Sequence, residues 1–126
     1  MFVTQLWSAE VVDYFGYDDC LQLSNDRTRV ILCPAVGGRV LEYSLDGKNA
    51  LYLDASEKGW LYEPGKRSDM SAGRFDIGPE KMIPSRPELW MGRWHGEITG
   101  PNSARMTSVK HRATGVQLTR DFESGS

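Results

Sequence analysis

Short apolar or alternating stretches, separated by turn signals, follow one another along most of the chain. A period of two is typical of strands, and a helical period is nearly absent, so the pattern predicts an all-β protein. Turns are expected at Gly-Gly, Asp-Gly and Gly-Pro pairs. The expected strands are residues 11–17, 20–24, 29–33, 39–45, 50–53, 94–99, 105–111 and 116–122. The strands within residues 9–53 form an antiparallel meander in this prediction.

The clearest local prediction is a hairpin whose two turn residues are Asp26 and Arg27. Two-residue loops are the commonest hairpin connections, and this one makes Asn25 face Thr28. In an antiparallel pair, the numbers of any two residues that face each other add up to the same total. The turn therefore sets the partner of every residue in both strands.

The same register places Cys20 opposite Cys33. It also puts four apolar side chains on one face, which makes a coherent core: Leu21, Leu23, Val30 and Leu32. The cysteines are then either a cross-strand disulfide or two buried thiols, and a reducing cytosol favours the thiols. In the next expected strand, Leu41, Tyr43 and Leu45 alternate with Glu42 and Ser44.

Residues 54–93 have a different character. They combine four prolines with charged residues and with the large aromatic residues Trp60, Tyr62, Phe75 and Trp90. Loops of this length within a compact domain are usually functional or disordered, and the aromatic content argues against disorder. We therefore expect one long, aromatic-rich functional loop within a single domain at residues 1–126.

The chain has 126 residues, 40% of them hydrophobic, and a formal net charge of −2. This composition is typical of a soluble domain, and the charge balance argues against nucleic acid as a partner. No apolar run approaches the ~20 residues of a membrane span, and the first ten residues do not resemble a signal peptide. The default expectation is a cytoplasmic protein that does not bind membranes.

Only two cysteines and two histidines are present. A zinc site of four thiolates is excluded, and His95 and His111 lie in different expected strands, so we expect no metal. Arg39 follows Gly37-Gly38, but no helix follows to bind a phosphate, so the glycines are explained by the turn itself.

Several short motifs occur in a recognisable order. They are LSN (23–25), PAVGGR (34–39), GKN (47–49), GRF (73–75) and PE (79–80). In this order and spacing the chain resembles the N-terminal half of galactose mutarotase-like proteins, in particular an uncharacterised branch related to aldose 1-epimerases. The resemblance covers residues 14–123.

The resemblance implies an antiparallel β-sandwich whose concave face binds a sugar and which needs no cofactor or metal. It further implies that this chain is an N-terminal portion. Residues 124–126 follow the last expected strand abruptly and are interpreted as a tail or a scar. Active epimerases open the pyranose ring with a histidine as general acid and a glutamate as general base. Those residues lie largely on strands beyond the matched region, so the resemblance implies that this chain alone is incomplete for catalysis.

The GRFD segment supplies the first candidate ligand contacts. Arg74 occupies the place where related proteins carry a sugar-facing basic residue, and its guanidinium suits adjacent hydroxyls. Its alternative role is an ion pair with Asp76. Asp76 and Glu80 have carboxylates that accept hydrogen bonds from sugar hydroxyls, or are solvated or paired.

Trp90, Trp94 and His95 complete the candidate substrate-binding set. An indole face stacks on sugar C–H groups, although the spacing of the two tryptophans also suits core packing. Histidine is a residue type suited to general acid catalysis near neutral pH, so His95 is a candidate general acid, while a structural role is the alternative for both histidines.

Three functions follow from these expectations. The first is a mutarotase-like domain that recognises a hexose or oligosaccharide, with epimerase activity if further strands complete it. The second is sugar binding without catalysis. The third is a structural or assembly domain that forms homo-oligomers through exposed strand edges, because unpaired edges invite pairing with another chain.

Overall fold

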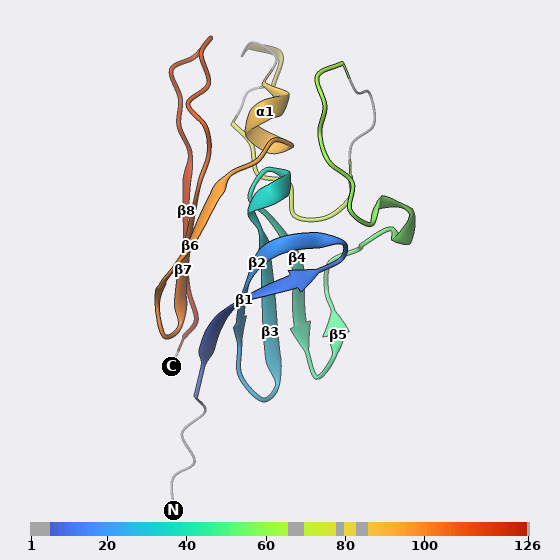
Figure 1. The fold of residues 1–126 in the computed structure, drawn as a ribbon, viewed down its shortest axis with the longest axis vertical. Helices are drawn as coiled ribbons and strands as arrows, with labels where there is room; N and C mark the ends of the chain where they lie inside the picture. The colour runs from blue at the N-terminus through green and yellow to red at the C-terminus, as the bar shows by residue number, and fades with distance from the viewer. Residues whose placement is uncertain (1–5, 66–69, 78–79, 83–85, 126) are drawn as a thin grey trace, which may run out of the picture.

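The computed structural model describes residues 6–65, 70–77, 80–82 and 86–125. Two antiparallel sheets make up the fold (Figure 1), one in the order β1-β2-β3-β4-β5 and one in the order β6-β7-β8. The strands are β1 (Ser8–Tyr14), β2 (Tyr17–Ser24), β3 (Thr28–Cys33), β4 (Arg39–Leu45), β5 (Lys48–Asn49), β6 (His95–Gly100), β7 (Ser103–Thr107) and β8 (Thr119–Glu123). Short helical turns lie between strands: η1 (Pro34–Val36), η2 (Ala55–Glu57), η3 (Glu80–Met82) and α1 (Pro87–Trp90). The all-β prediction agrees with this architecture.

The predicted β2–β3 hairpin is confirmed. The Asn25 N–H donates to the Thr28 carbonyl at 2.9 Å, which closes the two-residue turn. Leu21 pairs with Leu32, as the register requires. The side chain of Asn25 also accepts hydrogen bonds from the N–H groups of Arg27 and Thr28, which explains why an asparagine begins this turn.

Several predicted strand boundaries are wrong. In the smaller sheet, β7 ends at Thr107 rather than at residue 111, and β8 begins at Thr119 rather than at residue 116. The run at 11–17 is not one strand, because the chain reverses at Phe15 and Gly16, which both have positive φ (52° and 81°). Within the sequence this reversal is hidden, since aromatic residues flank the glycine. The short strand expected at 50–53 instead lies at Lys48–Asn49. It ends there because the Asn49 side chain accepts from the backbone N–H groups of Tyr43 and Leu51.

A β-bulge interrupts the alternation in β4. Ile31 pairs with Glu42 and Leu32 with Val40, so Leu41 is an extra residue on the β4 side. As a result Glu42 is buried, with 5% of its surface exposed, whereas Tyr43 is 57% exposed. A bulge of this kind re-aims the side chains that follow it.

The two sheets pack face to face through one hydrophobic cluster. The larger sheet contributes the predicted leucine face, and the smaller sheet contributes residues from β7 and the segment before β6. The buried members are Leu21, Leu23, Leu32, Trp94, Ala104 and Met106. A second cluster covers the opposite face of the larger sheet, where Cys20, Ile31 and Cys33 meet residues of η1 and of the loop after β5.

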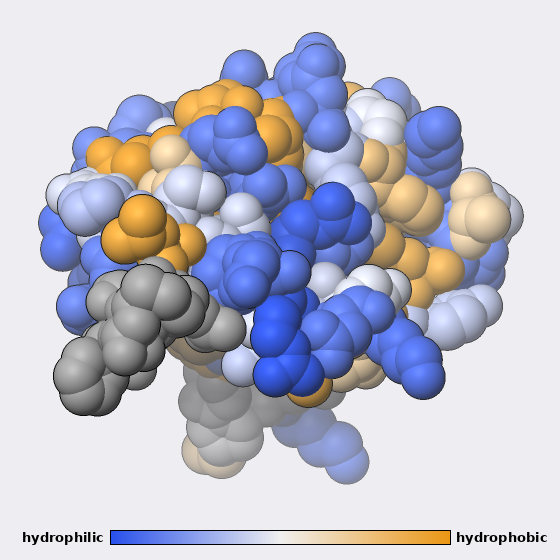
Figure 2. Space-filling model, turned by 90° about the horizontal axis from the view of Figure 1, so that it is seen from below, coloured by the Kyte–Doolittle hydropathy of each residue, from blue (hydrophilic) through white to orange (hydrophobic). Residues whose placement is uncertain are grey.

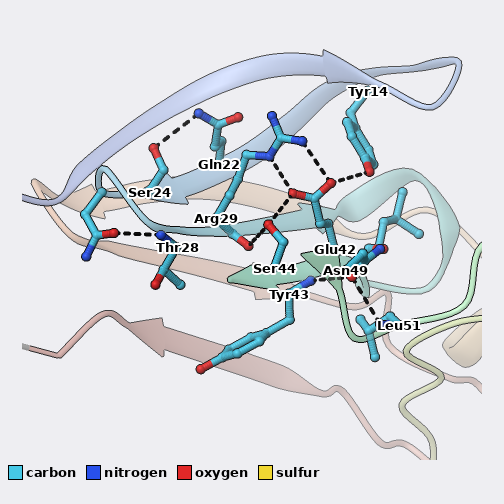
Figure 3. A network of polar contacts seen from close by, with 12 residues as sticks. Tyr14, Gln22, Ser24, Thr28, Arg29, Glu42, Tyr43, Ser44, Asn49 and Leu51 are labelled. Atoms are coloured by element: carbon cyan, nitrogen blue, oxygen red, sulfur yellow. Dashed lines mark hydrogen bonds and ion pairs between the residues drawn. The ribbon is translucent and has the colours of Figure 1, made fainter. Parts of the chain in front are cut away.

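A polar network surrounds the buried Glu42 on this second face (Figure 3). Its carboxylate accepts from the Tyr14 hydroxyl at 2.7 Å and from Ser44 at 2.8 Å. Arg29 donates to both carboxylate oxygens, at 2.5 and 2.9 Å. Tyr43 points away from the network on the other side of the strand. The donors to Glu42 are therefore supplied by β1 and β3 and by Ser44 of β4 itself.

This network predicts a change in stability at alkaline pH. Burial, and then the hydrogen bond to Glu42, raise the pKa of Tyr14 to about 12. A group whose folded pKa is raised stabilises the fold below its unfolded pKa, near 10, and loses that contribution as the pH rises toward 12. We expect the wild type to lose more free energy of unfolding across this interval than Tyr14→Phe, by about 1 kcal/mol after solvent screening. Urea unfolding at a series of pH values measures the difference.

Tyr43→Phe is the matched control, because Tyr43 lies outside the network and is largely exposed. The prediction fails if Tyr14→Phe and wild type lose stability equally.

At acid pH, Glu42 gives the stability of the fold the opposite pH dependence. Burial by itself would raise the pKa of Glu42, but the hydrogen bonds from Arg29, Tyr14 and Ser44 hold it below its usual value. The contribution of Glu42 is therefore lost as the pH falls through its lowered pKa.

Candidate functional site

Three of the predicted site residues lie together, but their polar groups bind one another. Asp76 is held by Arg86 in a bidentate ion pair, with N–O distances of 3.0 and 3.1 Å, and by Arg74 at 2.9 Å. The Arg74 guanidinium lies over the Trp90 ring, 3.9 Å from its centroid. The ion pair between Arg74 and Asp76 that was the alternative to ligand binding is thus present. Arg86, which the sequence did not single out, is the most buried member of this cluster, with 4% of its side chain exposed.

Trp94 is a core residue. Only 2% of its surface is exposed, and its ring meets Phe75 edge to face at 6.2 Å. The indole N–H donates to the Leu89 carbonyl at 2.7 Å. This is the core-packing role that its spacing suggested. Glu80 begins η3, and its side chain lies outside the described residues.

Arg39 and His111 also have structural contacts. Arg39 is fully buried and donates to the carbonyl oxygens of Ala72 and Trp90, at 2.6 and 3.2 Å. His111 lies 2.9 Å from a Glu88 carboxylate oxygen through Nε2 and 2.8 Å from the Thr114 hydroxyl through Nδ1. Both residues therefore connect loops to the body of the fold.

His95 lies in a different place, at the rim of a polar cleft of about 350 Å³. The cleft forms where the start of β2, the turn η1 and the start of β6 come together (Figure 1). Its polar side chains are those of Asp18, Asp19, Arg93 and His95, and all four are exposed to solvent. Pro34, Ala35, Trp94 and Gly96 complete the lining. The structure thus separates His95 from the cluster around Arg74.

A β-bulge places both aspartates at the cleft. Val12 pairs with Cys20 and Tyr14 pairs with Tyr17, so Asp18 and Asp19 together lie opposite one residue of β1. Asp19 has a φ of 58°, a conformation that aspartate tolerates better than most residues. Two adjacent aspartates in an otherwise alternating strand were the signal in the sequence, and reasoning from the sequence missed it.

Hydrogen bonding and close packing hold the opposite walls of the cleft together. The Trp94 N–H donates to the Pro34 carbonyl at 2.6 Å. A Cβ on Gly96 would lie 2.4 Å from the Pro34 ring, so only glycine allows β6 to approach η1 this closely. Arg93 and His95 are therefore fixed relative to Pro34 by the backbone on both sides of Trp94.

The cleft presents hydrogen-bond acceptors and donors beside an apolar surface. Asp18 and Asp19 accept, the Arg93 guanidinium donates, and His95 does either according to its protonation. No group of three or more histidine, cysteine or acidic side chains that could hold a metal ion occurs among the described residues.

A second cavity, of about 310 Å³, opens between the two sheets. Its lining is mainly apolar and includes Trp7, Val30, Tyr43 and Phe122, with Glu123 as its charged residue. The lining of this cavity has an acidic side chain but no cationic one, whereas the cleft at His95 has both. We therefore regard the cleft at His95 as the better candidate site.

Comparison of the chain with family models, with curated proteins and with solved structures gives no match. The resemblance to mutarotase-like proteins therefore stays a prediction, and the geometry of the cleft carries the functional argument. In the described part of the chain, no helix has the length and apolar character needed to cross a membrane.

Proposed function

We propose that this protein is a mutarotase-like carbohydrate-binding domain and that the cleft lined by Asp18, Asp19, Arg93 and His95 takes one hexose unit. The observation that carries the proposal is the meeting of two carboxylates with a guanidinium and an imidazole around one cleft. The packing of two antiparallel sheets and the order of the sequence motifs support the mutarotase-like fold.

The chemistry and the size of the cleft suit a sugar. Each sugar hydroxyl both donates and accepts, so it pairs with Asp18 or Asp19 on one side and with Arg93 on the other. A volume of about 350 Å³ falls at the lower end of the range for small-molecule sites, which favours one sugar unit over a long chain.

Calorimetric titration with glucose and with galactose tests the proposal. We expect saturable binding of at least one sugar, weakened about tenfold or more in Asp18→Asn and in Arg93→Ala, because each variant removes a charge-assisted hydrogen bond. The matched controls are Asp26→Asn and Arg112→Ala, which change exposed residues outside the cleft. Absence of binding at millimolar sugar, or equal weakening in the controls, contradicts the proposal.

Polarimetry of freshly dissolved sugar then separates binding from catalysis. We expect a rate of anomer interconversion equal to that of buffer, because His95, Asp18 and Asp19 are all exposed, and hydrated groups lack the water exclusion that ring opening benefits from. A faster rate that His95→Ala abolishes would instead identify an epimerase with His95 as its general acid.

Assembly through strand edges is the second candidate function. One observation favours it: Val11, on the outer strand β1, has 56% of its surface exposed. Against it, the side of the molecule seen in Figure 2 shows apolar areas that lie apart among hydrophilic side chains. Light scattering decides, because a monomer at high concentration contradicts assembly, whereas a dimer that Val11→Lys dissociates would support it.

A further inference from the structure

Cys20 and Cys33 are two buried cysteines, each next in sequence to a residue that lines the polar cleft. Both are free thiols with no exposed surface, and both belong to the hydrophobic cluster behind the larger sheet. The ladder pairs Leu21 with Leu32, and one position further along the same register Cys20 lies opposite Cys33. Neither thiol takes part in the proposed sugar binding.

The strand geometry suits a disulfide. Hydrogen-bonded and non-hydrogen-bonded pairs alternate along an antiparallel ladder. Counting from Asn25 and Thr28, whose backbones are hydrogen-bonded, makes Cys20 and Cys33 a non-hydrogen-bonded pair. Such pairs have Cα atoms about 4.5 Å apart, within the roughly 4.4–6.8 Å that a disulfide spans. The two sulfurs can therefore bond without a large movement of the backbone.

Each cysteine adjoins a residue of the cleft. Asp19 precedes Cys20, and Pro34 follows Cys33. Pro34 in turn accepts the 2.6 Å hydrogen bond from Trp94, the residue between Arg93 and His95. A change at the cysteine pair is thus linked by covalent bonds and one hydrogen bond to all four polar side chains of the cleft.

We propose that Cys20 and Cys33 are a redox-modification site whose oxidation to a cross-strand disulfide weakens ligand binding in the cleft. The second half of this statement rests on the proposed function. The physical reason is that bond formation draws the sulfurs to about 2.05 Å and shifts the attached backbone slightly. A shift of this kind at Asp19 and Pro34 misaligns donors and acceptors that act together on one sugar.

Hydrogen peroxide is the oxidant class that balances the step. The Cys20 thiolate attacks one peroxide oxygen, the O–O bond breaks, and hydroxide leaves to become water, so that Cys20 becomes a sulfenic acid. The Cys33 sulfur then attacks the Cys20 sulfur, its proton is released, and a second water leaves. In sum, two thiols lose two electrons and two protons, and one peroxide is reduced to two waters.

The environment of the pair supports this order of events. The hydrogen bond from Cys33 lowers the pKa of Cys20, whereas the same hydrogen bond and burial raise the pKa of Cys33. Cys20 is therefore the attacking thiol. The Cys20 sulfur lies 4.0 Å from the carbonyl oxygens of both Tyr14 and Tyr17, so the β1–β2 turn is part of what covers it.

The modification is tested by peptide mass mapping after treatment of the full chain with peroxide and alkylation of remaining thiols. We expect one linked peptide pair containing Cys20 and Cys33, reversed by a thiol reductant and absent from Cys20→Ser and Cys33→Ser. Met82, which is 81% exposed, reports in the same sample that the oxidant was present, through its sulfoxide. No linked peptide when Met82 is fully oxidised overturns the inference.

The effect on the cleft is read in two ways, so that it does not depend on sugar binding alone. We expect the imidazole resonances of His95 to move on oxidation and galactose or glucose affinity to fall about tenfold, the loss expected when one charge-assisted hydrogen bond is misaligned. Cys20→Ser should show neither change on treatment with peroxide. A disulfide that leaves both His95 and the affinity unchanged overturns the coupling.

The outcomes also separate this inference from the proposed function. If the disulfide forms and His95 shifts, but neither redox state binds sugar, the modification site stands and the proposed function fails. If the reduced protein binds sugar and no disulfide forms, the proposed function stands and the redox inference fails.

Discussion

Alanine at position 37 is expected to destabilise the protein by about 3–5 kcal/mol, through left-handed backbone strain combined with a steric clash. Gly37 has a φ of 70°, and a Cβ there would lie 2.1 Å from the Trp90 carbonyl oxygen. The backbone at Gly37 and the segment of Trp90 cannot move apart freely, because the Gly37 N–H donates to the Gly92 carbonyl at 2.6 Å. Since small domains have a free energy of unfolding of only about 5–15 kcal/mol, Gly37→Ala removes much of the total.

Gly47→Ala is the matched control for this prediction. Gly47 also has a positive φ, 81°, but a Cβ there meets nothing within 4 Å. Its cost is therefore backbone strain alone, about 1–2 kcal/mol. Urea unfolding of both variants, followed by circular dichroism, separates the clash from the strain. Equal losses in the two variants would show that α1 and η1 are not held in close contact.

Removing the carboxylate of Asp76 is expected to cost about 3–5 kcal/mol, the usual result of breaking a buried ion pair from one side. Without Asp76, the Arg86 guanidinium keeps the Ile77 carbonyl as a partner, at 2.7 Å, but loses its counter-charge in a site where 4% of the side chain is exposed. The Arg74 guanidinium that remains nearby adds like-charge repulsion. Thermal and urea unfolding of Asp76→Ala measure the loss.

Asp121→Ala is the control, because Asp121 also pairs with an arginine, Arg105, but 62% of its side chain is exposed. Exposed ion pairs contribute little to stability, so this variant should unfold close to wild type. The double variant Asp76→Ala/Arg86→Met should recover stability relative to Asp76→Ala, since it no longer buries an unpaired charge. If Asp121→Ala is as destabilising as Asp76→Ala, and if the double variant recovers no stability, then Asp76 acts through packing rather than charge.

Local patterns in the sequence were sufficient for the parts of the fold that depend on near neighbours. The two-residue turn after Asn25 and the leucine face of the β2–β3 hairpin were predicted, and the structure confirms both. Gly37 and Gly38 have the positive φ values that a glycine pair indicates at a turn. These features follow from backbone geometry and a period of two, which a short stretch of residues encodes completely.

Where the chain departs from these local rules, the sequence was a poor guide. The bulge at Leu41 turns Glu42 into the core and Tyr43 outward, against the alternation of the strand. The ion pair with Arg29 and the hydrogen bond from Tyr14 compensate this burial, and both partners come from other strands. A bulge is stable only where neighbouring strands supply such partners, so it cannot be inferred from the strand alone.

The sequence by itself therefore determined the all-β character and the hairpin register, because both depend on residues close together in the chain. Only the tertiary structure decided which polar residues meet. It joined Asp76 to Arg86 and placed His95 beside Asp18 and Asp19. The cleft arises where β2, η1 and β6 come together, and contacts between distant segments depend on how two sheets pack, which no local pattern specifies.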